Sequence, residues 1–314
     1  MLQLEQVEHR DGDRIKEGLL RCDACHVGYP IVRYVPRFVP NDGYAEGFGL
    51  EWNLHHRTQY DSRSGTPLSR MRFFEETGWP DRLDGEIVIE AGSGSGRFTE
   101  HALATGALVL SLDYSRAVDA NYASNGDHEN LLLVQADLFQ MPFPRDLADR
   151  VFCFGVLQHT PDPRRGLESL ISHLRPGGEL VVDAYVKTIP RYLFSPKYWV
   201  RPVTRRIPPE DLYRLTSRYV DLMWPLSRQL RRIPKLGKAI NWRLLIGDYS
   251  DSIEDDQVLR DWARLDTFDM LAPKYDQPVR LRTAARWCEE MNLSSPEVRR
   301  RYSRVEIHAK RPVA

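Results

Sequence analysis

Five short apolar runs alternate with longer polar segments between Gly85 and Tyr185. The runs are EIVIEAG, ALVLSLD, LLLVQAD, RVFCFGV and ELVVDAY, and each is rich in Val, Ile, Leu or Phe. Near-continuous apolar strands are typical of a parallel sheet that is buried on both faces. Because the segments between the runs are long enough for crossover helices, the pattern predicts βαβ units in a doubly wound α/β fold.

The remaining segments depart from this alternation, so we divide the chain around a core of residues 85–186. Residues 1–40 alternate apolar and polar residues between prolines, which predicts a small β element. Residues 41–84 carry aromatic residues at helical spacing and end at a Gly-Trp-Pro helix stop. Residues 187–276 are aromatic and interrupted by prolines, and we interpret them as a mainly helical insertion. Residues 277–314 predict a helix and a β-hairpin that complete the core.

The charge balance excludes whole-chain attraction to nucleic acid or anionic lipid, because Lys plus Arg and Asp plus Glu number 44 each. No apolar run approaches the ~20 residues of a bilayer span. The N-terminus is charged and lacks a secretory h-region, and four cysteines in 314 residues do not suggest a disulfide framework. We therefore expect a cytoplasmic protein and leave its oligomeric state open.

A glycine-rich turn follows the first predicted strand, with Gly92, Gly94 and Gly96 after Glu90. Glycines at a strand-to-helix turn let the backbone approach a ligand and leave helix N–H groups free. Position 97 is Arg where a dinucleotide fingerprint would carry its third glycine. Alone, the turn is suggestive only, and a structural glycine loop is the alternative.

Acidic residues end the next two predicted strands, Asp113 after the second and Asp137 after the third. A carboxylate at the first position can accept the two hydroxyls of a ribose, and one at the second can accept an adenine amino group. The fourth strand ends at Gly155, followed closely by His159. Each acid alone could be a helix N-cap. Their order on successive strand ends indicates a nucleoside site instead.

Together, the motifs E-x-G-x-G-x-G-R-F, D-Y-S, Q-A-D-L, G-V-L-Q-H-T-P-D-P and L-R-P-G-G-E-L resemble those of class I S-adenosylmethionine-dependent methyltransferases. The resemblance covers residues 85–186. It implies a seven-stranded Rossmann-like sheet whose last strand, from the C-terminal hairpin, is antiparallel. It also implies S-adenosylmethionine as the cofactor. The residues it assigns are Glu90, Gly92, Gly94 and Gly96 on the methionine and ribose side, Asp113 at the ribose hydroxyls with Tyr114 beside it, Asp137 and Leu138 at the adenine, and Gly155 at the sulfonium amino acid.

Two further resemblances concern the N-terminal segments. Residues 18–40, with Cys22 and Cys25, resemble the second half of the zinc-ribbon domain that is fused to some bacterial methyltransferases. The first C-x-x-C of that domain has no counterpart here, so we expect a remnant without metal. The stretch from Phe48 to Trp52 resembles the lid helices of such fused enzymes, and aromatic packing against the sheet is the alternative.

The insertion is the segment from which we expect acceptor identity. Between Lys187 and Arg243 it has 14 Lys and Arg residues, interleaved with aromatic residues, against only three acidic residues. Such a patch suits an anionic acceptor, an anionic membrane or RNA. A solvated helical face matched by the acidic run from Asp248 to Asp256 is the plain alternative.

Methyl transfer needs positioning and, for some acceptors, a base. We take His159 as the candidate base, with Asp269 and Tyr275 as candidate acceptor-site residues. An N-terminal capping role at the following helix is the alternative for His159. The neutral charge balance favours a small-molecule or lipid-linked acceptor and leaves peripheral membrane contact open. An RNA or protein methyltransferase and a non-catalytic binding module are the alternative functions.

Overall fold

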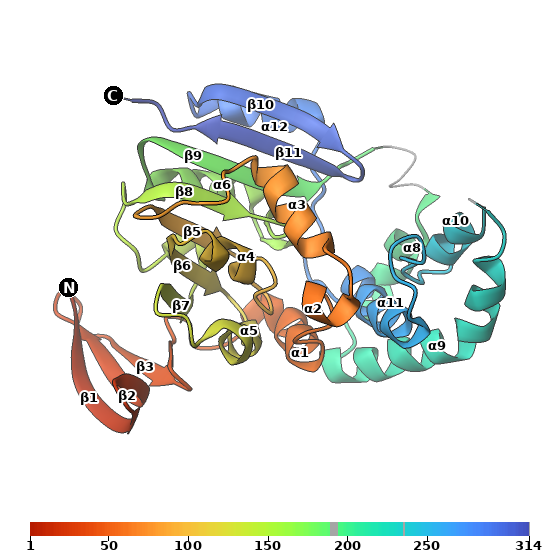
Figure 1. Cartoon of the computed structure of the whole chain (residues 1–314), viewed down its shortest axis with the longest axis horizontal. Helices are drawn as coiled ribbons and strands as arrows, with labels where there is room; N and C mark the ends of the chain where they lie inside the picture. Colours follow the sequence, from red (N-terminus) through yellow and green to blue (C-terminus); the bar gives the residue numbers. More distant parts are fainter. Residues whose placement is uncertain (189–193, 235, 314) are drawn as a thin grey trace.

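The computed structural model describes residues 1–188, 194–234 and 236–313, and its centre is a seven-stranded sheet (Figure 1). The strand order is β10-β11-β9-β8-β5-β6-β7. The strands are β5 (Ile87–Ala91), β6 (Leu108–Asp113), β7 (Leu131–Gln135), β8 (Ala148–Cys153), β9 (Leu174–Tyr185), β10 (Ser294–Arg301) and β11 (Arg304–Lys310). Strands β5 to β9 pair in parallel, whereas β11 runs antiparallel to β9. The predicted Rossmann-like sheet with an antiparallel C-terminal strand is confirmed.

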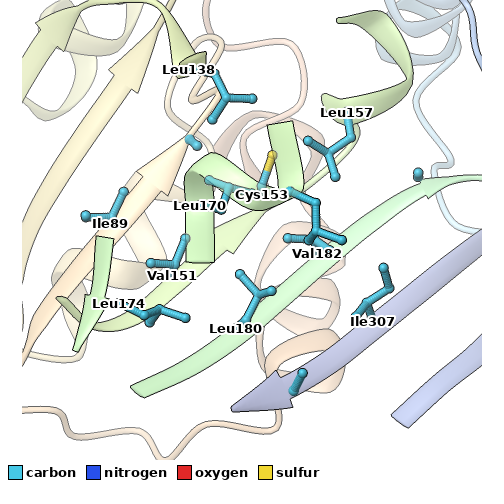
Figure 2. Close-up of a cluster of buried hydrophobic side chains, with 14 of the residues drawn as sticks. Ile89, Leu138, Val151, Cys153, Leu157, Leu170, Leu174, Leu180, Val182 and Ile307 are labelled. Carbon is cyan, nitrogen blue, oxygen red and sulfur yellow. The ribbon is translucent and has the colours of Figure 1, made fainter. Parts of the chain in front are cut away.

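Successive residues of the central strands are buried on opposite faces of the sheet. On β5, Ile89 packs with Val151 in one apolar cluster, and Val88 packs with Phe152 in another. Figure 2 shows the first cluster, in which Leu180 and Val182 of β9 lie beside Val151. Full burial of each such side chain contributes about 1.5–3 kcal/mol. The near-continuous apolar runs are explained by this two-sided burial.

Helices cover both faces of the sheet. The covering helices are α4 (Thr99–Ala104), α5 (Ala117–Asn125), α6 (Pro163–His173) and α12 (Leu281–Glu290). Helix α6 starts with Pro at its first position, and the Asp162 side chain accepts a hydrogen bond from the Arg165 N–H at 3.1 Å. This N-cap satisfies a backbone donor that the helix itself leaves unpaired.

The N-terminal residues form a separate antiparallel sheet that extends from the core at the lower left of Figure 1. Its strands are β1 (Leu2–Asp11), β2 (Arg14–Cys22), β3 (Gly28–Val32) and β4 (Val35–Pro36). It is attached beside β7, where the Phe38 N–H donates to the Gln135 carbonyl at 2.7 Å and Arg37 pairs with Asp119 at 2.6 Å. The small β element thus borders the end of the sheet nearest Asp137.

Cys22 and Cys25 lie at the turn between β2 and β3. Backbone N–H groups of Cys25 and Ala24 lower the pKa of the Cys22 thiol. Within residues 1–188, 194–234 and 236–313, no three His, Cys, Asp or Glu side chains gather as a metal site. The zinc-ribbon origin of this sheet stays a prediction.

Two helical groups flank the carboxyl edge of the parallel strands. The first consists of η1 (Gly43–Ala45), α1 (Glu46–Leu54) and α2 (Asp61–Ser64), and it is followed by α3 (Leu68–Thr77), whose Phe73 packs on a face of the sheet with Val88 and Phe152. The second consists of α8 (Pro196–Thr204), α9 (Pro209–Leu230), α10 (Leu236–Arg243) and α11 (Asp256–Leu271), on the right of Figure 1. Val220 and Trp224 of α9 pack against Trp262 and Ala263 of α11. No helix in the described part of the chain is long and apolar enough to cross a bilayer.

Candidate active site

A cavity of about 640 Å³ opens at the carboxyl edge of the parallel strands. Chain direction explains this position, because parallel strands deliver all their C-terminal loops to the same edge. The cavity walls come from the strand ends, from α1, from α11 and from the start of β11. The six predicted cofactor residues that line it are Gly92, Gly94, Asp113, Tyr114, Leu138 and Gly155.

The glycine turn after β5 has no room for side chains at two of its positions. Gly92 has φ +81°, and a Cβ there would overlap the Val156 side chain. Gly96 has φ +91°, and a Cβ there would overlap Asn121. Both positive φ values lie in the region that glycine tolerates best. The turn therefore keeps bare backbone at the cavity wall.

Asp113 is oriented by the loop that faces it. Its Oδ2 accepts a hydrogen bond from the Gly94 N–H at 2.9 Å, and its Oδ1 accepts from the N–H and hydroxyl of Ser115 at 2.8 Å each. Burial raises the pKa of this carboxyl. With these bonds made, Oδ2 keeps one unused lone pair, which can accept a ribose hydroxyl.

Tyr114 stacks on Tyr44 of η1, with ring centroids 4.7 Å apart. Both rings line the cavity, as does Trp52 of α1, which lies beside Gly94. Ser93 also lines the cavity, and its hydroxyl is buried without a hydrogen-bond partner among the residues that the structure describes. Bare backbone, ribose-type acceptors, an aromatic wall and an unpaired hydroxyl together fit a nucleoside cofactor.

Three predicted cofactor residues do not line the cavity. Glu90 is buried behind the glycine turn, where it accepts hydrogen bonds from Thr99 at 2.5 Å and Ser111 at 2.7 Å. Burial raises the pKa of its carboxyl to about 7. Gly96 lies on the inner side of the turn, against Asn121. The Asp137 side chain accepts a hydrogen bond from the Phe139 N–H at 2.9 Å and is the N-cap of η2 (Leu138–Gln140). Glu90 thus braces the turn from behind.

His159 lies on the cavity wall at the end of η3 (Leu157–His159). Its Nδ1 is 3.0 Å from the Tyr275 carbonyl oxygen, which can only accept, so Nδ1 carries the proton. Phe48 and Tyr185 pack against the ring at centroid distances of 5.1 and 5.5 Å. Burial lowers the pKa of His159, which leaves Nε2 as a free base at neutral pH.

The other two candidate acceptor-site residues take different positions. Asp269 of α11 lines the cavity, and the Tyr185 hydroxyl lies 3.4 Å from its Oδ2. The Tyr275 ring instead packs edge-on against Tyr44 at 5.5 Å, outside the cavity lining. Tyr275 therefore acts on His159 through its backbone carbonyl.

The structure adds cavity residues that sequence reasoning did not single out, among them Glu51, Arg97 and Asp266. Burial raises the pKa of Asp266 to about 7, and its Oδ2 accepts from the Tyr249 hydroxyl at 2.6 Å. Asp266 and Asp269 are three residues apart on one helix, a spacing that signals a shared face once the helix is known.

Arg97 is a partly buried cation among other cations. Burial, and then the neighbouring Arg72 and Arg304, lower the pKa of its guanidinium to about 9. Arg72 and Arg304 are both paired with Glu76 and Asp183. No ion pair joins Arg97 to a carboxylate in the described residues. Its guanidinium is available to an anionic ligand group.

Many cations of the insertion are neutralised within it. Arg231 pairs with Asp248 and Asp256, Arg214 with Asp211, and Lys238 with Asp251. Arg191, Tyr192 and Lys235, which belong to the basic and aromatic set, lie outside the described residues. The plain alternative of a helical face matched by nearby acids accounts for much of the patch.

Comparison with known proteins adds independent evidence. Residues 89–182 match a family model described as Methyltransferase domain. The Demethylmenaquinone methyltransferase of Corynebacterium kroppenstedtii is 27% identical over 179 residues, which are 53% of this chain and 75% of that protein. The Ubiquinone biosynthesis O-methyltransferase of Cupriavidus pinatubonensis is 29% identical over 125 residues, which are 38% of this chain and 50% of that protein.

A solved structure of human N-acetylserotonin methyltransferase in complex with SAM is 14% identical, over 87% of this chain and 57% of that chain, with a TM-score of 0.42. The chain spans only part of its curated relatives, down to 40% of a Demethylmenaquinone methyltransferase from Clavibacter sepedonicus. Residues 89–182 are thus similar to a methyltransferase domain, and the cofactor is S-adenosylmethionine, as the strand-end motifs predict.

Proposed function

We propose that this protein transfers the methyl group of S-adenosylmethionine to a small-molecule acceptor, and that the acceptor is lipid-linked. One observation carries the proposal. The cavity continues from the cofactor-type strand ends to a second half around His159, lined by Phe48, Tyr185 and Tyr249. Its volume of about 640 Å³ lies in the range of sites that enclose small organic ligands.

The cofactor, when bound, supplies a methyl group on a positively charged sulfur. Gly92, Gly94 and Asp113 would hold it, and the aromatic residues would exclude water from the transfer path. His159 Nε2 would take the proton of an acceptor hydroxyl or amine, because Nδ1 is already committed to the Tyr275 carbonyl. Arg97 would bind a carboxylate, either of the cofactor's methionine part or of the acceptor.

The names of the two relatives support a quinone-related acceptor, since both refer to quinone methylation or biosynthesis. An exposed apolar row on α9 supports a lipid-linked one. Leu215, Leu222 and Leu226 are 55%, 79% and 47% exposed, and their spacing of seven and four residues places them on one helix face. Arg218 and Arg232 are exposed near this row, and within the described residues neither has an acidic partner. Apolar side chains with cationic flanks are typical of a helix that lies on an anionic membrane.

Loss of a cofactor ligand tests the core of the proposal. Asp113→Ala should weaken binding of S-adenosylhomocysteine by about 1–3 kcal/mol, because two ribose hydroxyls lose their charged acceptor. Calorimetry on the wild-type and variant chains measures this. Asp127→Ala, at an exposed position, is the matched control. Equal affinities of wild type and Asp113→Ala would contradict the assignment.

The alternative of an RNA methyltransferase rests on the cations that have no acid partner, such as Arg218 and Arg232. RNA binding through phosphate contacts would fall ~10³-fold or more over a few-fold rise in salt. If the protein bound tRNA fragments with that dependence and ignored anionic lipid vesicles, the lipid-linked acceptor would be wrong.

A further inference from the structure

Glu51 is a buried acidic side chain without a partner among residues 1–188, 194–234 and 236–313. It lies on α1, is 1% exposed and lines the cavity. In this described part of the chain, neither of its carboxyl oxygens has a hydrogen-bond partner. Burying a polar group without a partner is unfavourable, and burying a charge is more so. An unpaired, buried carboxyl group in a cavity wall therefore indicates that its hydrogen-bond partner is on the ligand.

The groups that face Glu51 keep it uncharged. Asp266 and Asp269 face it from α11, and Tyr213 faces it from α9 with its hydroxyl 2.9 Å from His55 Nε2. Of the other elements packed on α1, η1 contributes Tyr44, whose ring stacks on Tyr114.

The α5 side contributes Arg116, whose guanidinium is bound to Asp42 at 2.9 Å. Arg116 is therefore already paired. Burial, and then Asp269 and Asp266, raise the pKa of Glu51 well above its usual range. A carboxyl group that is buried beside two acids, with no cation paired to it among the described residues, binds a proton.

The position of Glu51 is between the cofactor loop and the candidate base. Phe48, Glu51 and Trp52 share one face of α1, since they are three and four residues apart. Trp52 lies beside Gly94, and the Phe48 ring is 5.1 Å from the His159 ring. A molecule held between Gly94 and His159 lies within reach of the Glu51 carboxyl.

We propose that Glu51 acts as a neutral carboxylic acid and donates a hydrogen bond to an oxygen of the methyl acceptor. The acceptor would then carry a phenol, enol or carbonyl oxygen. This inference rests on the proposed function. As His159 removes the acceptor's proton, negative charge grows on that oxygen, and a fixed donor in a dry site stabilises it. The alternative is an ionised Glu51 that binds an amine of the acceptor. For that alternative, replacing the carboxylate by the amide of Gln should weaken binding.

The test uses the full chain loaded with S-adenosylhomocysteine, and phenol as the probe. Glu51→Gln keeps a donor of similar shape and should bind phenol about as well as wild type, including at high pH. Glu51→Leu removes the donor and should bind phenol about tenfold more weakly. Wild-type affinity should fall as pH rises through the pKa of Glu51. Glu46→Gln, at an exposed position on the same helix, is the matched control and should change nothing.

Infrared difference spectra of wild type minus Glu51→Gln provide a readout that needs no acceptor. A protonated-carboxyl band near neutral pH supports the proposal, and its absence overturns it. Equal loss of phenol binding in the Gln and Leu variants would indicate an ionised Glu51 that accepts from the phenol hydroxyl, and would overturn the proposal. Equal binding of phenol by all variants, or no binding by wild type, would also overturn it. If the wild-type chain fails to bind S-adenosylhomocysteine, the proposed function itself fails. If the wild type and every variant bind S-adenosylhomocysteine with the same affinity, the phenol and infrared results test only the role of Glu51.

Discussion

The tautomer of His159 is decided by one backbone atom. Because the Tyr275 carbonyl accepts from Nδ1, the remaining lone pair is on Nε2, and the aromatic rings of Phe48 and Tyr185 limit rotation of the imidazole. The residue that sets this geometry is 116 positions away in the chain. Sequence spacing could suggest a histidine near the fourth strand, but not which of its nitrogens is a base.

We expect His159→Gln to lower kcat for methyl transfer by about 10²–10⁴-fold, the usual contribution of a general base. Affinity for S-adenosylhomocysteine should stay within about twofold, since the ring lies in the acceptor half. In wild type, kcat should fall with acidification only below the ordinary histidine pKa, because burial lowers the pKa of His159. Single-turnover rates across pH measure both effects. An unchanged kcat in the variant would remove His159 from the chemistry.

The strand-end positions of the cofactor residues could be predicted because strand direction delivers them to one edge. The direction of each side chain could not. Glu90 and Asp137 occupy predicted positions, yet Glu90 points to Thr99 and Ser111, and Asp137 caps a short helix. A local donor decides such cases, and whether a donor is close depends on packing. The same applies to Glu51, which is buried and faces Asp266 and Asp269 of α11.

At the level of elements, His55 links the N-terminal helices to the insertion. It caps α1, and its ring nitrogens lie 3.0 Å from the Thr58 hydroxyl and 2.9 Å from the Tyr213 hydroxyl of α9. Burial lowers the pKa of His55 from 6.5 to about 4. The folded chain therefore takes up this proton at a lower pH than the unfolded chain does.

Acidification should weaken this link. Between pH 7 and pH 5 the unfolded chain protonates His55 and the folded chain does not, so this residue should destabilise the fold by about 2 kcal/mol over that range. In His55→Gln the contribution is absent. The gap in unfolding free energy between wild type and variant should therefore shrink by that amount, which urea titrations at the two pH values measure. A gap that is independent of pH would show that His55 titrates normally in the folded state.

The five central strands could be predicted from composition because burial on both faces forces continuous apolar runs. The helices of the insertion were harder to delimit. Pro202 lies inside α8 and Pro225 inside α9, although proline within a helical pattern favours a break. Tertiary packing of Trp224 and Val220 on α11 offsets the lost hydrogen bond in α9.

For the whole molecule, the exposed apolar row on α9 predicts attachment to a membrane surface. We expect binding to vesicles that contain anionic lipid, with weaker binding at higher salt. Leu222→Asp should lower the vesicle-bound fraction several-fold, because it places a charge where an apolar side chain would enter the lipid. Leu281→Asp is the control, since Leu281 is 40% exposed at the first position of α12 and far from α9 in the sequence. Co-sedimentation distinguishes them, and equal binding of the two variants would exclude α9 as the contact.

Strand β11 lies between β9 and β10, and its first residue, Arg304, forms part of the cavity wall. During synthesis, the residues of the cofactor half up to Gly155 leave the ribosome well before Arg304 does. The cavity wall is therefore incomplete until β11 has inserted between its two neighbours. The proposed methyl transfer would then be confined to chains whose translation has passed this strand.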